Sequence, residues 1–77
     1  MAKDHARPYP NPAQDRFALS IEPKDLDAVH LIDATGRVVR SWAMTNEFLL
    51  AGLKSGAYVV QASFNDGSER RWPLVVQ

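Results

Sequence analysis

The sequence lacks cysteine, long apolar runs and any excess of charge. Without cysteine among its 77 residues, the chain has no disulfide scaffold, thiolate metal site or thiol chemistry. No apolar run approaches the roughly 18 residues of a membrane-spanning helix, and residues 1–7 lack the apolar core of a signal peptide. Basic and acidic residues number nine each, so the net charge is zero. We therefore expect no nucleic-acid partner, because phosphate binding needs clustered excess lysine and arginine.

Residues that carry chemistry are few and scattered. The two histidines, His5 and His30, lie far apart, and His30 belongs to an alternating stretch in which it faces outward. A metal site needs three or four convergent ligands, and Asp25 and Asp27 lack the spacing of a calcium loop. No nucleophile with a partner base, acid–base pair or glycine-rich phosphate loop is present. We therefore expect no catalytic residue, no metal and no cofactor.

The first 15 residues have the composition of a leader or linker. The stretch Pro8-Tyr9-Pro10-Asn11-Pro12 carries three prolines in five residues. Proline fixes φ and pushes the preceding residue toward extended geometry, which predicts a stiff segment without helix. We expect residues 16–77 to form one domain, and any signal for export to lie elsewhere in a longer chain.

Alternating apolar and polar residues predict a series of short strands beyond this leader. The turn Asp33-Ala34-Thr35-Gly36 and the turn Asn65-Asp66-Gly67 each predict a hairpin, because glycine accepts a left-handed backbone conformation. Pro73 cannot donate to a ladder, so its strand is expected at an edge, or with that position facing outward. The predicted strands are 16–21, 28–33, 37–42, 57–64 and 68–76.

The strand at 57–64 has the longest pattern and is expected to be the centre of the fold. Tyr58 and Val60 share an apolar face with the next two even-numbered residues, whereas the odd-numbered residues form a more polar face. Gly56 lies where the chain turns into this strand. The Tyr58 hydroxyl is expected to bond a nearby backbone group, as in the tyrosine corner of immunoglobulin-like sandwiches.

The segment from Thr45 to Leu53 is ambiguous. Asn46 could cap a short helix, but six residues are marginal for a helix in so small a domain, and a strand at 47–50 is favoured. The pattern as a whole predicts a small immunoglobulin-like antiparallel β-sandwich of six to seven strands. The expected core residues are Phe17, Leu19, Ile21, Val29, Leu31, Val38, Leu53, Tyr58, Val60, Phe64 and Leu74.

Two features near the end of the chain are unusual for such a sandwich. Arg70 and Arg71 precede Trp72 and form a basic-aromatic patch, which either protects an edge strand by charge or recognises an acidic partner. The sequence then stops within an apolar strand that contains Val75, Val76 and Gln77. A terminus held in a sheet is less usual than a frayed one, and the long apolar strand suggests a homodimer through this final edge.

Taken in order, these pieces resemble the C-terminal sorting domain of the type IX secretion system. The resemblance covers residues 9–77 and is specific through the order and spacing of four motifs rather than through any one of them. The motifs are Tyr9-Pro10-Asn11-Pro12, the Gly-Arg hairpin at Gly36-Arg37, the Leu-x-x-Gly-x-Tyr segment with Gly56 and Tyr58, and the basic-then-apolar ending Arg70-Arg71-Trp72-Pro73-Leu74-Val75-Val76-Gln77.

The resemblance implies a domain joined to an N-terminal cargo protein, which it directs through the periplasm and across the Gram-negative outer membrane. Its implied partners are the type IX translocon and a sortase-like peptidase that cuts the linker and attaches the cargo to surface lipopolysaccharide. The cargo would be secreted or held at the cell surface.

A generic immunoglobulin-like adhesive or carbohydrate-binding module is the alternative reading. A sugar platform needs coplanar exposed aromatic rings, for which Trp42 and Trp72 are the only tryptophans. Burial of both would weaken this alternative. An enzyme fragment is a third reading, and it lacks any catalytic constellation.

Overall fold

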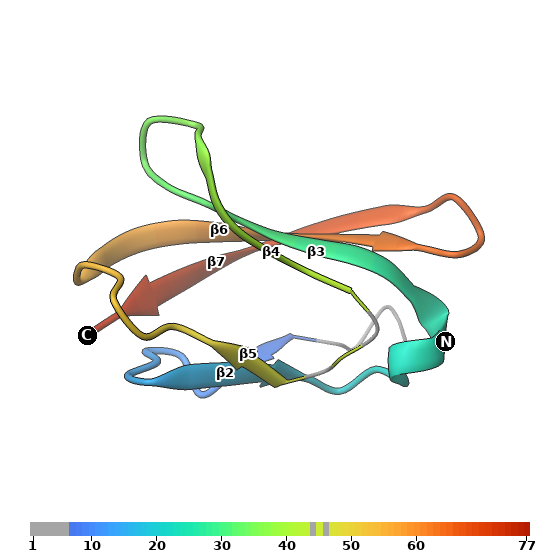
Figure 1. Cartoon of the computed structure of the whole chain (residues 1–77), viewed down its shortest axis with the longest axis horizontal. Helices are drawn as coiled ribbons and strands as arrows, with labels where there is room; N and C mark the ends of the chain where they lie inside the picture. The colour runs from blue at the N-terminus through green and yellow to red at the C-terminus, as the bar shows by residue number, and fades with distance from the viewer. Residues whose placement is uncertain (1–6, 44, 46) are drawn as a thin grey trace.

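The computed structural model describes residues 7–43, 45 and 47–77. Within them, seven strands form two antiparallel sheets that face each other (Figure 1). The small sheet has the order β1 (Pro8–Tyr9), β2 (Arg16–Leu19) and β5 (Glu47–Leu49). The large sheet has the order β4 (Val38–Trp42), β3 (Leu26–Ile32), β6 (Gly56–Phe64) and β7 (Glu69–Val76). A single-turn 3-10 helix, η1 (Pro23–Asp25), precedes β3. The predicted immunoglobulin-like β-sandwich is thereby confirmed.

The strand expected at the centre of the fold, β6, lies inside the large sheet between β3 and β7. Its apolar face points into the sandwich, where Val60 and Ala62 are fully buried and Phe64 nearly so. Both neighbours pair with it over most of its length. The two-residue period of the sequence therefore identified both the strand and its buried face.

Both glycine hairpins form as predicted. At the β3–β4 turn, the Gly36 amide donates to the Asp33 carbonyl at 3.0 Å, and Gly36 has a φ of 89°. Gly67 closes the β6–β7 turn in the same way, donating to the Phe64 carbonyl at 2.9 Å, also with a φ of 89°. In both turns the left-handed position belongs to the residue without a Cβ atom.

The ambiguous segment contains a strand, and the helical alternative is wrong. β5 occupies Glu47–Leu49, and Asn46 lies outside the described residues. Phe48 pairs with Phe17 of β2, and the two rings stack with centroids 4.7 Å apart. Both side chains are fully buried. Ring contact across the small sheet thus outweighs the weak helical signal of so short a segment.

The core agrees with the sequence except at Val38, which is 50 % exposed. A bulge causes this difference: Leu31 pairs with Arg40 and Ile32 with Val38, so Val39 is the extra residue. Val39 packs against the core instead. Leu53 and Tyr58 are partly buried and pack against the core, and the other predicted residues are buried. The list of expected core residues lacked five that are buried, Ala13, Leu26, Phe48, Leu50 and Val76, and it also omitted Ala62, although the alternation had placed Ala62 on the inward face of its strand.

Part of the expected leader belongs to the sandwich. Pro8 and Tyr9 pair with Leu19 and Ala18 of β2, and Ala13 is fully buried. Arg7 to Asp15 contains no helix, as predicted. Proline content correctly predicted an extended segment, but it could not reveal that the segment has pairing partners within the domain.

Candidate functional site

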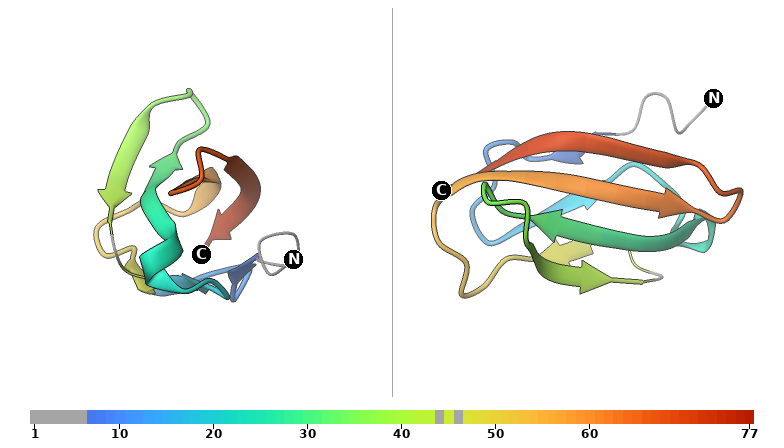
Figure 2. Two further views of the ribbon diagram at one scale, coloured as in Figure 1. Left: turned by 90° about the vertical axis from the view of Figure 1, so that its right-hand side faces the viewer. Right: turned by 90° about the horizontal axis from the view of Figure 1, so that it is seen from above.

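Most of the motif residues gather at one end of the sandwich, here called the motif end. It comprises the β3–β4 turn with Gly36 and Arg37, the start of β6 at Gly56, and the end of β7 at Val76 (Figure 2). Because β3 pairs antiparallel with β4 and β6, and β6 with β7, these three segments lie at the same end of the large sheet. Three motifs spread over about half of the sequence therefore share one surface.

The Tyr-Pro-Asn-Pro motif joins this end by covering the outer edge of β7. The Asn11 side-chain amide donates to the Pro73 carbonyl at 3.1 Å, and its oxygen accepts from the Val75 amide at 3.0 Å. The side chain thus replaces the peptide group of a neighbouring strand. The peptide bonds before Pro10 and Pro12 are cis.

Ala13 continues the same edge with backbone bonds. Its amide donates to the Val75 carbonyl at 2.7 Å, and its carbonyl accepts from the Gln77 amide at 2.7 Å. Ala13 and Val76 form a parallel bridge. Together the contacts of Asn11 and Ala13 with residues 73–77 form what we call the edge clasp.

Pro73 fits this edge for a simple geometric reason. β7 is an edge strand, as predicted. The Val75 amide points away from β6 toward Asn11, so alternation turns the backbone of Pro73 the same way. The position without an N–H group therefore needs no donor toward β6.

The β3–β4 turn at the motif end is organised by Asp33. One oxygen of its carboxylate accepts from the Thr35 hydroxyl at 2.6 Å, the Thr35 amide at 2.9 Å and the Arg37 amide at 3.0 Å. The Thr35 hydroxyl, then the Arg37 amide, lower the pKa of Asp33 below its ordinary value of 3.8. The ionised carboxylate therefore stabilises the turn fully when the pH is above that ordinary pKa. This contribution to stability is lost as the pH falls through the lowered pKa of the folded state.

Tyr58 secures the loop that leads into β6. Its hydroxyl donates to the Lys54 carbonyl at 2.7 Å, which confirms the predicted bond to a nearby backbone group. This bond closes the Leu-x-x-Gly-x-Tyr segment around Gly56. The motif tyrosine therefore acts through the shape of the loop while its ring packs against the core.

We expect Tyr58→Phe to lower the free energy of unfolding by about 1 kcal/mol, the typical net contribution of one hydrogen bond. Urea denaturation followed by tryptophan fluorescence would measure it. Tyr9→Phe is the matched control, because the half-exposed Tyr9 makes no hydrogen bond through its hydroxyl to a described residue. Equal stability of both variants would contradict a role for the Tyr58 hydroxyl.

Arg70 and Arg71 lie apart from the motif end, toward the β6–β7 hairpin. Arg71 pairs with Gln61 and Arg70 with Ala62, and both arginines are exposed. Next to this stretch is a surface hollow of about 230 Å³, lined by Arg7, Pro8, Asn11, Trp72 and Pro73.

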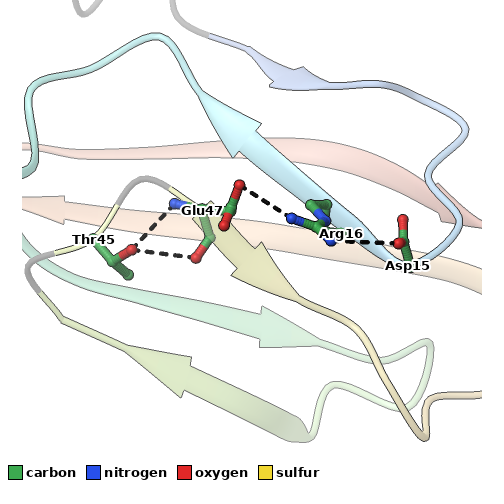
Figure 3. Close-up of polar contacts among 4 residues, drawn as sticks. All are labelled: Asp15, Arg16, Thr45 and Glu47. Carbon is green, nitrogen blue, oxygen red and sulfur yellow. Dashed lines mark hydrogen bonds and ion pairs between the residues drawn. The ribbon is translucent and has the colours of Figure 1, made fainter.

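A separate polar group lies on the outer face of the small sheet (Figure 3). Arg16 lies between Asp15, at 3.7 Å, and Glu47, at 3.4 Å. The Thr45 hydroxyl bonds the backbone of Glu47 at 3.2 Å. The three charged side chains are largely exposed, so their ion pairs support the β2–β5 pairing only weakly.

The two tryptophans do not form a sugar-binding platform. Trp42 and Trp72 lie on β4 and β7, the opposite edges of the large sheet, and both pack against the core. Trp42 contacts the rings of Phe17 and Phe48 with centroids 5.9 and 5.1 Å away. The condition that would weaken the carbohydrate-binding alternative is largely met, because both rings face inward.

The described residues contain no cluster of three or more histidine or acidic side chains that could hold a metal ion. In the same part of the chain, no helix has the length and apolarity needed to span a membrane.

Sequence reasoning missed Ala13 as a partner of β7, although it named Asn11, Val75 and Gln77 separately. The available signal was the edge position predicted for the strand with Pro73. An edge strand leaves backbone N–H and C=O groups unpaired, and a short segment elsewhere in the chain can pair with them. The homodimer expected through the final edge remains a prediction, and the edge clasp occupies residues 73–77 of that edge.

Comparison with known proteins gives one family. The family model for the secretion system C-terminal sorting domain matches residues 7–76. No curated protein sequence matches the chain significantly. The matched range includes Asn11 and Ala13 as well as the whole of β7, so it spans both sides of the edge clasp. The chain therefore belongs to the family of C-terminal sorting domains of the type IX secretion system.

Proposed function

We propose that this domain is the folded address by which the type IX machinery of a Gram-negative envelope exports an N-terminally linked cargo. The family places the chain among secretion sorting signals, which act on a cargo through the secretion machinery. The cargo is delivered to the cell surface or the medium. A sortase-like peptidase cuts the segment that precedes Pro8 and either releases the cargo or attaches it to the surface.

The observation that carries this proposal is the convergence of the motif segments at the motif end. The edge clasp ties the first motif to the last strand, whereas the turns at Gly36 and Gly56 flank the same end. A receptor that contacts this end meets residues from across the chain only when the sandwich is folded. The folded state is therefore part of the signal, which fits recognition by shape and by a strand edge.

An export assay tests the proposal. Residues 7–77 are fused behind a general secretory signal peptide and a fluorescent reporter, in a host that has the type IX machinery. We expect the reporter outside the cell for the intact domain, and in the periplasm after deletion of residues 70–77, because the deletion removes most of β7.

A host strain without the translocon is the control, and it should retain the intact fusion in the periplasm. Retention of the intact fusion in the cognate host would refute the proposed function. So would equal export with and without the translocon.

A further inference from the structure

The outer face of the large sheet carries an apolar row that crosses all four strands. In register, Val38 of β4 pairs with Ile32 of β3, Ile32 with Val59 of β6, and Val59 with Pro73 of β7. Residues directly opposite in antiparallel strands share a face. Ile32 follows the fully buried Leu31, and Val59 precedes the fully buried Val60. Successive side chains of a strand point to opposite faces, so this row points away from the core.

A second apolar pair extends the row toward the motif end. Ala57 of β6 pairs with Val75 of β7, two residues beyond Val59 and Pro73. Val38 is 50 % and Val75 43 % exposed, and Ala57 and Pro73 are exposed as well. With strands about 4.8 Å apart, the surface is on the order of 15 Å wide. We call Ile32, Val38, Ala57, Val59, Pro73 and Val75 the apolar face.

The next row on the same surface is polar. It runs from Ser41 through His30 and Gln61 to Arg71, and the His30 Nδ1 atom lies 2.8 Å from the Ser41 hydroxyl. An outward sheet face of a small domain is ordinarily polar throughout. The apolar face is therefore a local departure from that rule, at the end of the sheet where the motifs gather.

Cations flank the apolar face at both sides. Arg71 lies beside it on β7, and Arg37, with its side chain 79 % exposed, precedes Val38. One carboxylate oxygen of Asp33 accepts from Thr35 and the Arg37 amide, and the other forms an ion pair with the Arg37 side chain at 3.9 Å. This pair is long and the Arg37 side chain is largely exposed, so the contact is weak and the guanidinium stays accessible to a partner. A second copy docked on this face would bring like charges together at its rim, which is unfavourable.

From this arrangement we infer that the apolar face is a docking surface for a protein component of the secretion machinery. That component presents an apolar patch with carboxylates placed against Arg37 and Arg71. The inference rests on the proposed function and names a second surface for it, continuous with β7 through Pro73 and Val75. Contiguous exposed apolar residues with a polar rim are typical of such interaction sites.

The export assay tests this surface with a paired variant, Val38→Thr with Val59→Thr. Threonine keeps the β-branched shape but replaces a methyl group with a hydroxyl at both positions. We expect export to fall about tenfold, the effect of losing two buried methyl groups at an interface, while the melting temperature stays within a few degrees. Leu49→Thr is the control, since Leu49 is 55 % exposed on the small sheet and should leave export unchanged.

Charge provides a second variant. The double variant Arg37→Glu with Arg71→Glu should lower export further than Arg37→Lys with Arg71→Lys. Glutamate would repel the carboxylates proposed for the partner, whereas lysine keeps the positive charge. A photo-crosslinking residue at position 38 should give an adduct with a translocon component, absent at position 49 and absent in the host without the translocon.

The outcomes separate the two proposals. Normal export of both the intact fusion and the Val38/Val59 variant would overturn the inference that the apolar face is a docking surface, but would leave the proposed function standing. A crosslink from position 38 to a second copy of the domain would overturn it too. Failure to export even the intact fusion would refute the proposed function and this surface with it.

Discussion

Asn11→Ala is expected to weaken the domain by about 1–2 kcal/mol and to lower export about tenfold. The change removes both hydrogen bonds that the side-chain amide makes to Pro73 and Val75, each with a net value of about 1 kcal/mol. It also uncovers backbone groups of the β7 edge, so the surface that a receptor meets is altered. A shift of about 1.4 kcal/mol in docking corresponds to that factor of ten.

Asn65→Ala is the matched control for this prediction. Its side-chain amide donates to the carbonyl of Lys24 in η1, at the opposite end of the sandwich. Asn65→Ala removes one hydrogen bond where Asn11→Ala removes two, so it should lower stability in urea denaturation by about 1 kcal/mol but leave export near that of the parent. Equal export of the Asn11 and Asn65 variants would mean that the edge clasp acts on stability alone.

Two further variants examine the clasp from each side. Asn11→Asp keeps the acceptor for the Val75 amide but sets a carboxylate oxygen against the Pro73 carbonyl, so we expect it to lose export as Asn11→Ala does. Val75→Pro removes the donor from the opposite side. Since that amide faces away from β6, the β6–β7 pairing should persist.

Phe48→Ala is expected to unfold a large fraction of the domain. Phe48 is fully buried, stacks on Phe17 with centroids 4.7 Å apart and meets the Trp42 ring at 5.1 Å. Such truncations cost about 3–5 kcal/mol, whereas a domain of this size has a total stability of about 4–12 kcal/mol. The melting temperature should fall by more than about 12 °C, given about 4–8 °C per kcal/mol.

Thermal unfolding followed by circular dichroism would check this, with Leu49→Ala as the control. Leu49 is the next residue along β5 but is 55 % exposed, so its loss should change stability by no more than about 0.5 kcal/mol. Similar melting temperatures for the two variants would show that the ring contacts among Phe17, Trp42 and Phe48 do not hold the sheets together.

The strands and turns were largely predictable because their signals are local. The alternation of residues 57–64 identified the buried face of β6, and the glycines at 36 and 67 identified the hairpins. The Val38 prediction was wrong because a β-bulge shifts one strand relative to its partner, and a bulge has no reliable local signature. That error concealed the apolar face.

The motif residues were named as candidates from the sequence, but their arrangement in space was not predicted. Tyr9 to Pro12 was assigned to a leader, since three prolines in five residues predict a stiff extended segment and nothing more. The structure gives Asn11 a partner 64 residues away in the sequence. No periodicity or spacing links two segments at that distance.

The sequence by itself determined that this chain is an all-β domain without cysteine, with strands at nearly their observed positions and with the motifs of a sorting domain. The fold class and the strands follow from composition, the two-residue period and turn chemistry, which act between neighbours in the chain, whereas the sorting-domain motifs rest on resemblance to a known family. Only the tertiary structure decided that the motifs meet at one end, that Asn11 completes the edge of β7 and that an apolar row faces outward. Each of these depends on which strands pair and in which register, and register is set by the packing of the whole sandwich.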